Sequence, residues 1–296
     1  MGMRLKDKAA VVTGSSMGVG RAVALLMAEE GADLVLTGRN IEPLNQVAKE
    51  IQNLGRRAVI AQGDVSIKEQ AERMIDAAVD SFGKIDILVN NAGITRDRMI
   101  FNLTDEEWDE VVKVHLYGYF HCARRACQLM RQQRSGRILN MSSRVAMGTV
   151  GQANYVAAKA GVLGFTYSVA RDMGKYGVTC NAIFPAAGTR QTITPEYLAS
   201  KEKRAASGVK TEARAGEELP PPECVAPIVV YLASDEAVNI NGQVFFSWGG
   251  EIAHYSPIAP TKSVFAPAGK WTVDELEATF PATLGRDLVN PAPAQL

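Results

Sequence analysis

The chain has 296 residues, of which 47% are hydrophobic, so it is long enough to bury one large core or two smaller ones. Lysine and arginine total 32, and so do aspartate and glutamate. This balance excludes the positive excess typical of proteins that bind nucleic acid or anionic membranes. The cysteines form no CxxC pair and have no histidine at metal-ligand spacing, which predicts reduced, mostly buried thiols and no metal site. They are Cys122, Cys127, Cys180 and Cys224.

No apolar run approaches the roughly 18 residues that a membrane-spanning helix needs. The first eight residues lead directly into a strand pattern and lack the apolar stretch of a signal peptide. We therefore expect a soluble, cytoplasmic protein without a membrane segment.

Short runs rich in β-branched residues alternate with longer helical patterns along the chain. Strands are predicted at Ala9–Thr13, Asp33–Thr37, Ala58–Gln62, Ile85–Asn90, Arg137–Met141, Val178–Phe184 and Gln243–Phe246. Helices are predicted near 19–31, 41–54, 67–82, 105–133, 152–176 and 223–234. This alternation indicates βαβ units and a doubly wound α/β fold with a parallel sheet. Ser66 with Glu69 and Thr104 with Glu107 predict capping boxes at two helix starts.

Two segments stand outside the alternation. Residues 186–222 form a polar insertion before the last strand, and residues 249–296 form a tail with six of the 13 prolines. One short helix is predicted in the tail at Val273–Ala278. We expect a single domain over residues 1–248 and a C-terminal extension over 249–296.

A glycine-rich turn follows the first predicted strand and precedes the first helix. Glycines at this place allow a tight turn and let a pyrophosphate approach backbone amides at a helix N-terminus. The arrangement predicts a Rossmann-type dinucleotide site. The alternative is an ordinary turn, which would also use glycine. The predicted contacts are Gly14, Ser16, Met17, Gly18, Val19 and Gly20.

The end of the second strand bears on the choice of dinucleotide. An acid there usually holds the ribose of NAD, whereas a cation accommodates the extra phosphate of NADP. Here Arg39 follows the strand and the first acid is Glu42. NADP is therefore expected, with NAD as the alternative, although Arg39 could also be an ordinary exposed residue beside a helix.

Tyr155 and Lys159 lie four residues apart early in a predicted helix, which places them on one face. An ammonium beside a phenol favours the phenolate and lowers the phenol pKa toward the working range of an acid–base catalyst. Ser142 ends the fifth strand, where open α/β sheets bind ligands, and we expect its hydroxyl to hold a substrate oxygen. The adjacent Ser143 is expected to point elsewhere.

Together these motifs, with the Asn90–Gly93 segment, resemble the short-chain dehydrogenase/reductase family over about residues 5–250. The resemblance implies an enzyme that interconverts a secondary alcohol and a ketone, with Tyr155 as general acid/base, Lys159 as pKa modulator and ribose ligand, and Ser142 as the substrate-orienting hydroxyl. It also implies cofactor contacts from Asp64, Val65, Asn90, Ala92, Gly93, Tyr155, Lys159, Pro185, Gly188 and Thr189.

Two departures from the family pattern matter. His115 stands where the family usually has an asparagine that positions a water in the proton relay, and Ala186 stands where Pro-Gly is usual. An imidazole can accept and donate a proton, so His115 can serve as a relay or simply pack in its helix.

The segments around His115 and at 187–192 are similar to the (3R)-hydroxyacyl-CoA dehydrogenase unit of peroxisomal multifunctional β-oxidation enzymes. Residues 94–98 also fit 3-oxoacyl-carrier-protein reductases. These resemblances imply a 3-hydroxyacyl or 3-oxoacyl thioester as the small-molecule substrate. A hydroxysteroid or other bulky alcohol, and a non-catalytic partner subunit that keeps the cofactor fold, remain alternatives.

The resemblance further implies that residues 186–222 are a substrate lid and that long helices build a homotetramer or homodimer. The cations of the insertion could meet a CoA phosphate or form a solvated charged loop. The tail could cover a neighbouring subunit or its own domain.

Overall fold

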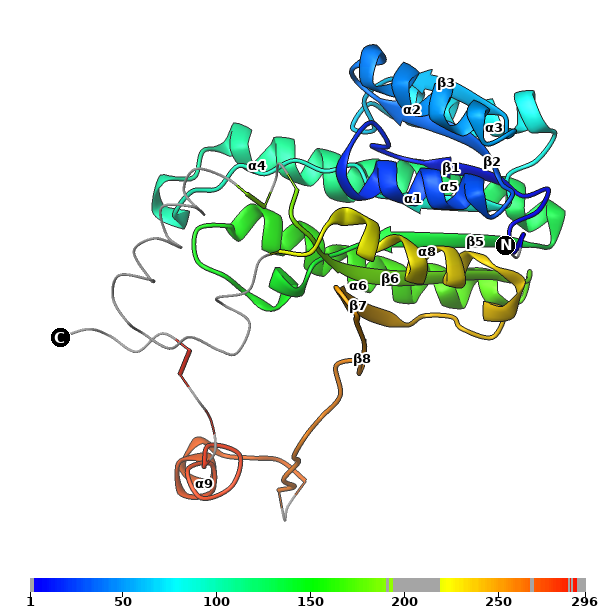
Figure 1. The fold of residues 1–296 in the computed structure, drawn as a ribbon. Helices are drawn as coiled ribbons and strands as arrows, with labels where there is room; N and C mark the ends of the chain where they lie inside the picture. The colour runs from blue at the N-terminus through cyan, green and yellow to red at the C-terminus, as the bar shows by residue number, and fades with distance from the viewer. Residues whose placement is uncertain are drawn as a thin grey trace. The chain divides into compact units, whose positions relative to one another are not determined.

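A single eight-stranded sheet runs through the part of the chain that the structure describes, in the order β3-β2-β1-β4-β5-β6-β7-β8 (Figure 1). The structure is a computed structural model, and it describes residues 3–189, 192–193, 219–266, 269–286, 288 and 290–291. Neighbouring strands from β3 to β7 are parallel, and β8 pairs antiparallel with β7. The strands are β1 (Ala9–Val12), β2 (Asp33–Gly38), β3 (Ala58–Gln62), β4 (Ile87–Asn90), β5 (Gly136–Met141), β6 (Val178–Ala186), β7 (Val244–Trp248) and β8 (Glu251–Tyr255).

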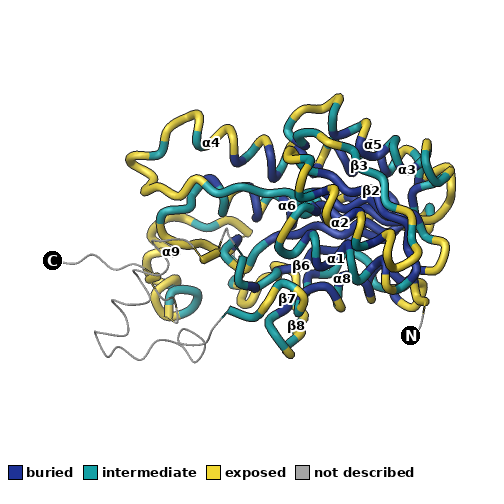
Figure 2. Tube along the Cα trace, turned by 45° about the horizontal axis from the view of Figure 1, so that its top comes forward, coloured by how far each residue is buried: buried dark blue, intermediate teal, exposed yellow. Residues whose placement is uncertain are grey.

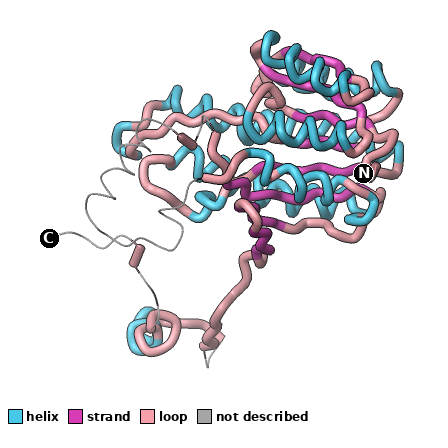
Figure 3. The backbone as a smooth tube through the Cα atoms, viewed as in Figure 1, coloured by secondary structure: helices cyan, strands magenta, loops and turns pink. Residues whose placement is uncertain are grey.

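Helices cover both faces of this sheet (Figure 3). The α-helices are α1 (Gly18–Glu29), α2 (Ile41–Asn53), α3 (Lys68–Phe82), α4 (Asp105–Val112), α5 (Gly118–Gln133), α6 (Ala153–Gly174), α8 (Ala226–Ala233) and α9 (Val273–Thr279). A π-helix, η2 (Lys113–Tyr117), joins α4 to α5. The short 3-10 turns are η1 (Ile100–Asn102), η3 (Arg144–Met147), η4 (Pro222–Cys224) and η5 (Asp235–Ala237). The predicted doubly wound α/β fold is confirmed.

The strand period explains the two cores. Because successive side chains point to opposite faces, Val12 packs with α1, α2 and α8, whereas its neighbour Val11 packs with α3, α5 and α6. The central strands are therefore buried on both faces, as Figure 2 shows. Each fully buried aliphatic side chain contributes about 1.5–3 kcal/mol to folding, so this double burial is the main source of stability.

One predicted capping box is present and the other is wrong. Thr104 accepts from the Glu107 amide and Glu107 reaches back to the Thr104 amide, which caps α4. Helix α3 begins at Lys68, after an Ile67 that offers no side-chain cap. The Ser66 hydroxyl instead donates to the Asp64 carboxylate, because that acceptor lies only two residues away.

The single helix predicted over 105–133 is interrupted at η2. A π-helix accommodates an extra residue in its turn, and such turns are common at functional sites. His115, which departs from the family pattern, lies within this π-helix.

The chain divides into two compact units, Met1–Tyr255 and Ser256–Leu296. Strand β8 belongs to the first unit, which therefore extends beyond the boundary expected at residue 248. In the second unit, α9 begins with a capping box between Thr272 and Glu275, at the place expected for the tail helix. All four cysteines are free thiols, and Cys122 and Cys180 are buried. Among the described residues, no helix has both the length and the apolar character that crossing a bilayer requires.

Candidate active site

A pocket of about 510 Å³ opens at the carboxyl ends of the parallel strands. The strand order reverses between β1 and β4, and open α/β sheets bind ligands at such a switch point. The pocket wall runs from Arg39 and Asn40 at one end, past the glycine turn, to Tyr155, Lys159 and Pro185. A long groove with this lining matches an extended, two-ended ligand better than a compact one.

The glycine turn has no space for side chains. A Cβ atom on Gly20 would lie 2.3 Å from the Gly14 carbonyl oxygen, and one on Gly14 would lie 2.9 Å from the Ala92 Cα atom. Gly14 and Gly18 also have φ angles of +66° and +57°, which side chains rarely adopt. Asn91 fastens the turn, because its side-chain amide donates to the carbonyls of Thr13 and Gly14 at 2.9 and 3.1 Å.

The first amides of α1 are available to a ligand. Helix α1 has Met17 at its N-cap without a side-chain cap, and no described side chain hydrogen-bonds to the amides of its first turn. The helix dipole adds partial positive charge at this end. The turn and the helix start therefore fit the pyrophosphate of a dinucleotide.

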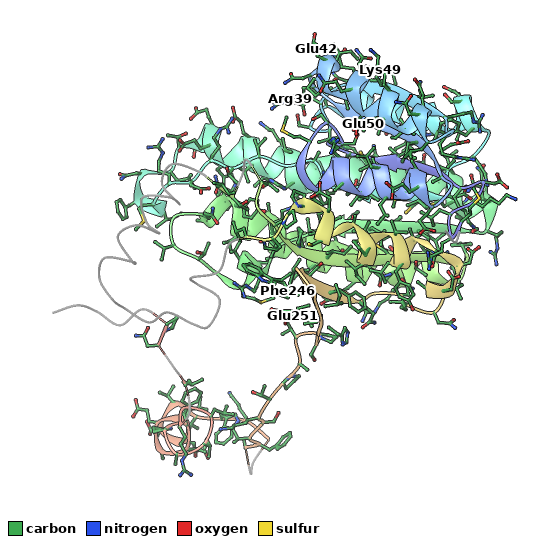
Figure 4. All side chains as sticks on the ribbon, viewed as in Figure 1. Arg39, Glu42, Lys49, Glu50, Phe246 and Glu251 are labelled. Carbon is green, nitrogen blue, oxygen red and sulfur yellow. The ribbon has the colours of Figure 1, made fainter. Side chains whose placement is uncertain are left out.

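Arg39 stands at the rim of the same pocket, beside the start of α2 (Figure 4). Its side chain is 66% exposed, and one guanidinium nitrogen lies 3.9 Å from an Asp64 oxygen. An ion pair that is this exposed and this long contributes little to stability, so the guanidinium can leave it and bind another anion at a small cost in free energy. Asp64 is the one carboxylate in the described pocket wall, and its other oxygen accepts from the Ser66 amide and hydroxyl.

The serine assignment from the sequence needs correction. Ser142 is 1% exposed, and its hydroxyl donates to the Lys159 carbonyl oxygen at 2.8 Å. The Ser143 hydroxyl instead hydrogen-bonds to Tyr155. Strand β5 ends at Met141, and the chain then turns into η3, so the alternation that seemed to point Ser143 away from the pocket no longer applies. The structure brings Ser143, rather than Ser142, to the phenol.

Burial controls the acid–base properties of Tyr155 and Lys159. Desolvation raises the pKa of Tyr155 to about 12, while the hydrogen bond from Ser143 opposes this rise. Desolvation also lowers the pKa of Lys159 to about 7. The lysine nitrogen lies 5.5 Å from the centre of the Tyr155 ring. The two side chains share the pocket, and burial is the largest influence on the pKa of each.

His115 lies behind these groups. Its ring meets the Tyr155 ring edge-on, with the ring centres 5.0 Å apart. Nε2 lies 2.7 Å from the Ile94 carbonyl oxygen and 3.1 Å from the Ile94 amide nitrogen, so the tautomer decides whether Nδ1 accepts or donates a hydrogen bond. Nδ1 is buried and has no hydrogen-bond partner among the residues that the structure describes. Burial, helped by the charge on Lys159, holds the pKa of His115 well below its usual value, so the imidazole is neutral.

Gly93 makes room for this imidazole. A Cβ atom at residue 93 would lie 2.4 Å from the His115 ring, so any side chain there would displace the histidine. The Asn90–Gly93 motif therefore shapes the relay region as well as the cofactor groove.

With one exception, the residues predicted to contact a cofactor line the pocket. The exception is Asn90, which is fully buried and donates to the Asn140 side chain at 2.9 Å. It joins β4 to β5 below the pocket floor because its side chain points into the sheet–helix interface. The neighbouring Asn91 lines the pocket instead. Most of the expected lid falls at 190–191 and 194–218, outside the described residues, and so do its cations.

The pH behaviour of Tyr155 gives a direct check on this geometry. With a pKa of about 12, its phenolate should be scarce in the ligand-free protein at pH 9. Wild type and Tyr155→Phe should then show the same tyrosinate absorbance from pH 7 to pH 9. A phenolate that forms near neutral pH and disappears in the variant would mean that Lys159 already lowers the pKa.

Comparisons with known proteins agree with this geometry. Residues 8–200 match the short chain dehydrogenase family. A hydroxyacyl-CoA dehydrogenase of Mycobacterium tuberculosis is 39% identical over 291 residues, which covers 93% of this chain and 88% of that protein. A 3-oxoacyl-acyl-carrier-protein reductase of Staphylococcus aureus is 40% identical and covers 82% of this chain and 97% of its own length.

A solved structure, a short chain dehydrogenase from Mycobacterium avium, superposes with a TM-score of 0.80 at 38% identity. It covers 95% of this chain, and 96% of its own length is matched. The chain belongs to the short-chain dehydrogenase family and is an oxidoreductase that acts on CH–OH groups with NAD(P).

Proposed function

We propose that the protein interconverts 3-hydroxyacyl and 3-oxoacyl thioesters, with NADP(H) as the redox partner. The observation that carries this proposal is the grouping of Ser143, Tyr155 and Lys159 in one pocket with the glycine turn. A bound nicotinamide would supply the hydride chemistry at the carbon that bears the substrate oxygen. The chain's own residues then need only bind, orient and move a proton.

Tyr155 exchanges that proton with the substrate oxygen. In ketone reduction the phenol donates its proton to the oxygen as the carbonyl carbon gains a hydride, and the reverse steps oxidise the alcohol. Ser143 holds the same oxygen, because its hydroxyl already lies at the phenol. A phenol with a raised pKa is protonated at neutral pH, so the ligand-free site is prepared for reduction.

His115 extends the proton path behind Tyr155. Its buried Nδ1, which has no partner among the described residues, is the atom best placed to hydrogen-bond to a relay water. Because Nε2 contacts only the Ile94 backbone, the neutral imidazole would orient such a water through Nδ1 and carry no charge in the apolar interior. This supports a relay role for the histidine that replaces the usual asparagine.

The preference for NADP rests on Arg39. Its guanidinium is exposed at the pocket rim and only weakly paired with Asp64, so it is available to a phosphate. The glycine turn and the α1 amides would hold the pyrophosphate. The segment with Pro185, Gly188 and Thr189 would lie at the nicotinamide end.

The choice of an acyl thioester comes from the relatives. The hydroxyacyl-CoA dehydrogenase aligns with 93% of this chain, which includes part of Ser256–Leu296. The carrier-protein reductase aligns with only 82%, which is less than the first compact unit. The longer match favours a CoA thioester over a carrier-protein thioester. The homodimer or homotetramer and the cytoplasmic location remain predictions.

A substrate screen tests the proposal. We expect turnover of 3-oxoacyl-CoA with NADPH, followed by loss of the reduced-nicotinamide absorbance, at a higher kcat/KM than 3-oxoacyl-carrier-protein thioesters or steroid ketones. Turnover of steroid ketones alone would favour the bulky-alcohol alternative. Tight NADPH binding without turnover of any ketone would favour the non-catalytic partner.

The two serines form a matched pair of variants. Ser143→Ala should lower kcat about 100-fold, since removing one oxygen-holding donor costs about that much in related chemistry. Ser142→Ala should keep most of the activity, because its hydroxyl serves the Lys159 carbonyl. Tyr155→Phe should abolish turnover and still bind NADPH. The opposite ranking of the two serines would restore Ser142 to the catalytic role.

Arg39→Asp should reverse the cofactor preference. Loss of a charge-assisted hydrogen bond and addition of a carboxylate should reduce kcat/KM with NADPH by about 10- to 100-fold relative to NADH. Arg73→Asp is the matched control, since Arg73 is an exposed arginine on α3 that does not line the pocket. An unchanged NADPH/NADH ratio in Arg39→Asp would remove Arg39 from phosphate recognition.

A further inference from the structure

Tyr119 is a buried phenol beside the active site that belongs to none of the motifs in the sequence. It lies in the first turn of α5, four residues after His115, and is 1% exposed. Its ring centre is 6.4 Å from that of His115. A phenol buried this deeply usually has a hydrogen-bond partner for its hydroxyl.

The hydroxyl of Tyr119 takes part in a closed set of contacts with Lys159. It donates to the Met141 carbonyl oxygen at 3.1 Å and accepts from the Lys159 nitrogen at 3.3 Å. The same lysine nitrogen donates to the Met141 carbonyl at 2.5 Å. Two oxygens, one from α5 and one from the end of β5, therefore hold the ammonium.

These two oxygens replace most of the hydrogen bonds to water that the ammonium loses on burial. Lys159 is 3% exposed, and no carboxylate in the described part of the chain forms an ion pair with it. A charged group taken from water without compensating hydrogen bonds is strongly destabilised. An ammonium has three N–H donors, so the two oxygens leave one for the pocket.

We propose that Tyr119 is a positioning residue of the active site, which keeps Lys159 charged and directed at the pocket by hydrogen-bonding to its ammonium. The proposal rests on the proposed role of Lys159. No residue of the catalytic motifs was expected to stabilise the buried Lys159 ammonium, which has no counter-charge among the described residues. The proposal gives this role to a phenol in α5.

The other titratable groups around Lys159 cannot replace this support. Burial raises the pKa of Tyr155 to about 12 and that of Tyr119 well above its usual value. Burial also raises the pKa of Cys122, which lies near Tyr119, to about 12, and His115 is neutral. Among the described residues, no negative charge therefore faces the ammonium at neutral pH. Since the pKa of Lys159 is already about 7, loss of one oxygen should make the amine neutral under working conditions.

The test is Tyr119→Phe, which keeps the ring and removes only the hydroxyl. The pKa of Lys159 is measured without turnover, from the pH dependence of its acetylation by trace acetic anhydride and mass spectrometry of the peptide. We expect a downward shift of about one pH unit, the size expected for loss of a hydrogen bond to a charged group. The alkaline limb of the kcat/KM profile should move down by the same amount.

Tyr255→Phe is the control, since Tyr255 lies on β8 against Phe184, away from the pocket wall. It should change neither measurement. An unchanged acetylation profile in Tyr119→Phe, or an equal shift in Tyr255→Phe, would overturn the proposal. Because acetylation needs no substrate, the pKa of Lys159 can be measured even if the protein does not turn over acyl thioesters.

A second variant covers the case in which Tyr119→Phe does not fold. If the hydroxyl serves the ammonium, removing that ammonium removes the need for it. Tyr119→Phe should then fold in a Lys159→Met background, with a thermal unfolding midpoint close to that of Lys159→Met alone. A double variant that also fails to fold would show that the hydroxyl supports the fold itself, and the proposal would be wrong.

Discussion

A single buried ammonium imposes the strictest requirement on this active site. Lys159 is buried and has no carboxylate partner in the described part of the chain, so neutral oxygens replace its hydration. Those oxygens come from the end of β5 and the start of α5, and the lysine itself comes from α6. The three elements have to meet at one edge of the sheet, and right-handed crossovers in a parallel sheet bring them there. The fold is thus the means by which a costly charge is kept beside a phenol.

Desolvation outweighs the attraction between the two catalytic groups in the protein alone. Burial pushes Tyr155 toward a neutral phenol and Lys159 toward a neutral amine. The Lys159 nitrogen lies 5.5 Å from the centre of the Tyr155 ring, and burial remains the largest influence on the pKa of both groups. Burial therefore favours the neutral form of both groups, and Tyr155 keeps its proton at neutral pH. A protonated phenol is the form that can donate a proton to the substrate oxygen during ketone reduction.

Helices and strands with a regular hydrophobic period could be predicted from the sequence, whereas the local turns at their ends could not. The parallel strands, the helices and the glycine turn followed from hydrophobic periodicity and placement, because both faces of the sheet are buried. The wrong assignments have local causes. Strand alternation ends at Met141, so it misplaced the neighbouring serines, and Asp64 took the hydroxyl that was expected to cap α3. Tyr119 carried no signal at all, since only tertiary packing brings its hydroxyl to Lys159.

The π-helix at Lys113–Tyr117 ties the backbone of this region to its chemistry. Deleting one residue there would restore regular α-helical hydrogen bonding, so the shortened helix would have the better backbone hydrogen-bond geometry. It would also rotate everything downstream by about 100°, the angle between successive residues of an α-helix. Tyr119 would leave the ammonium and His115 would lose its place over Gly93. The π-helix therefore sets the spacing between its flanking helices. An insertion or deletion within it would move side chains of this region away from the active site.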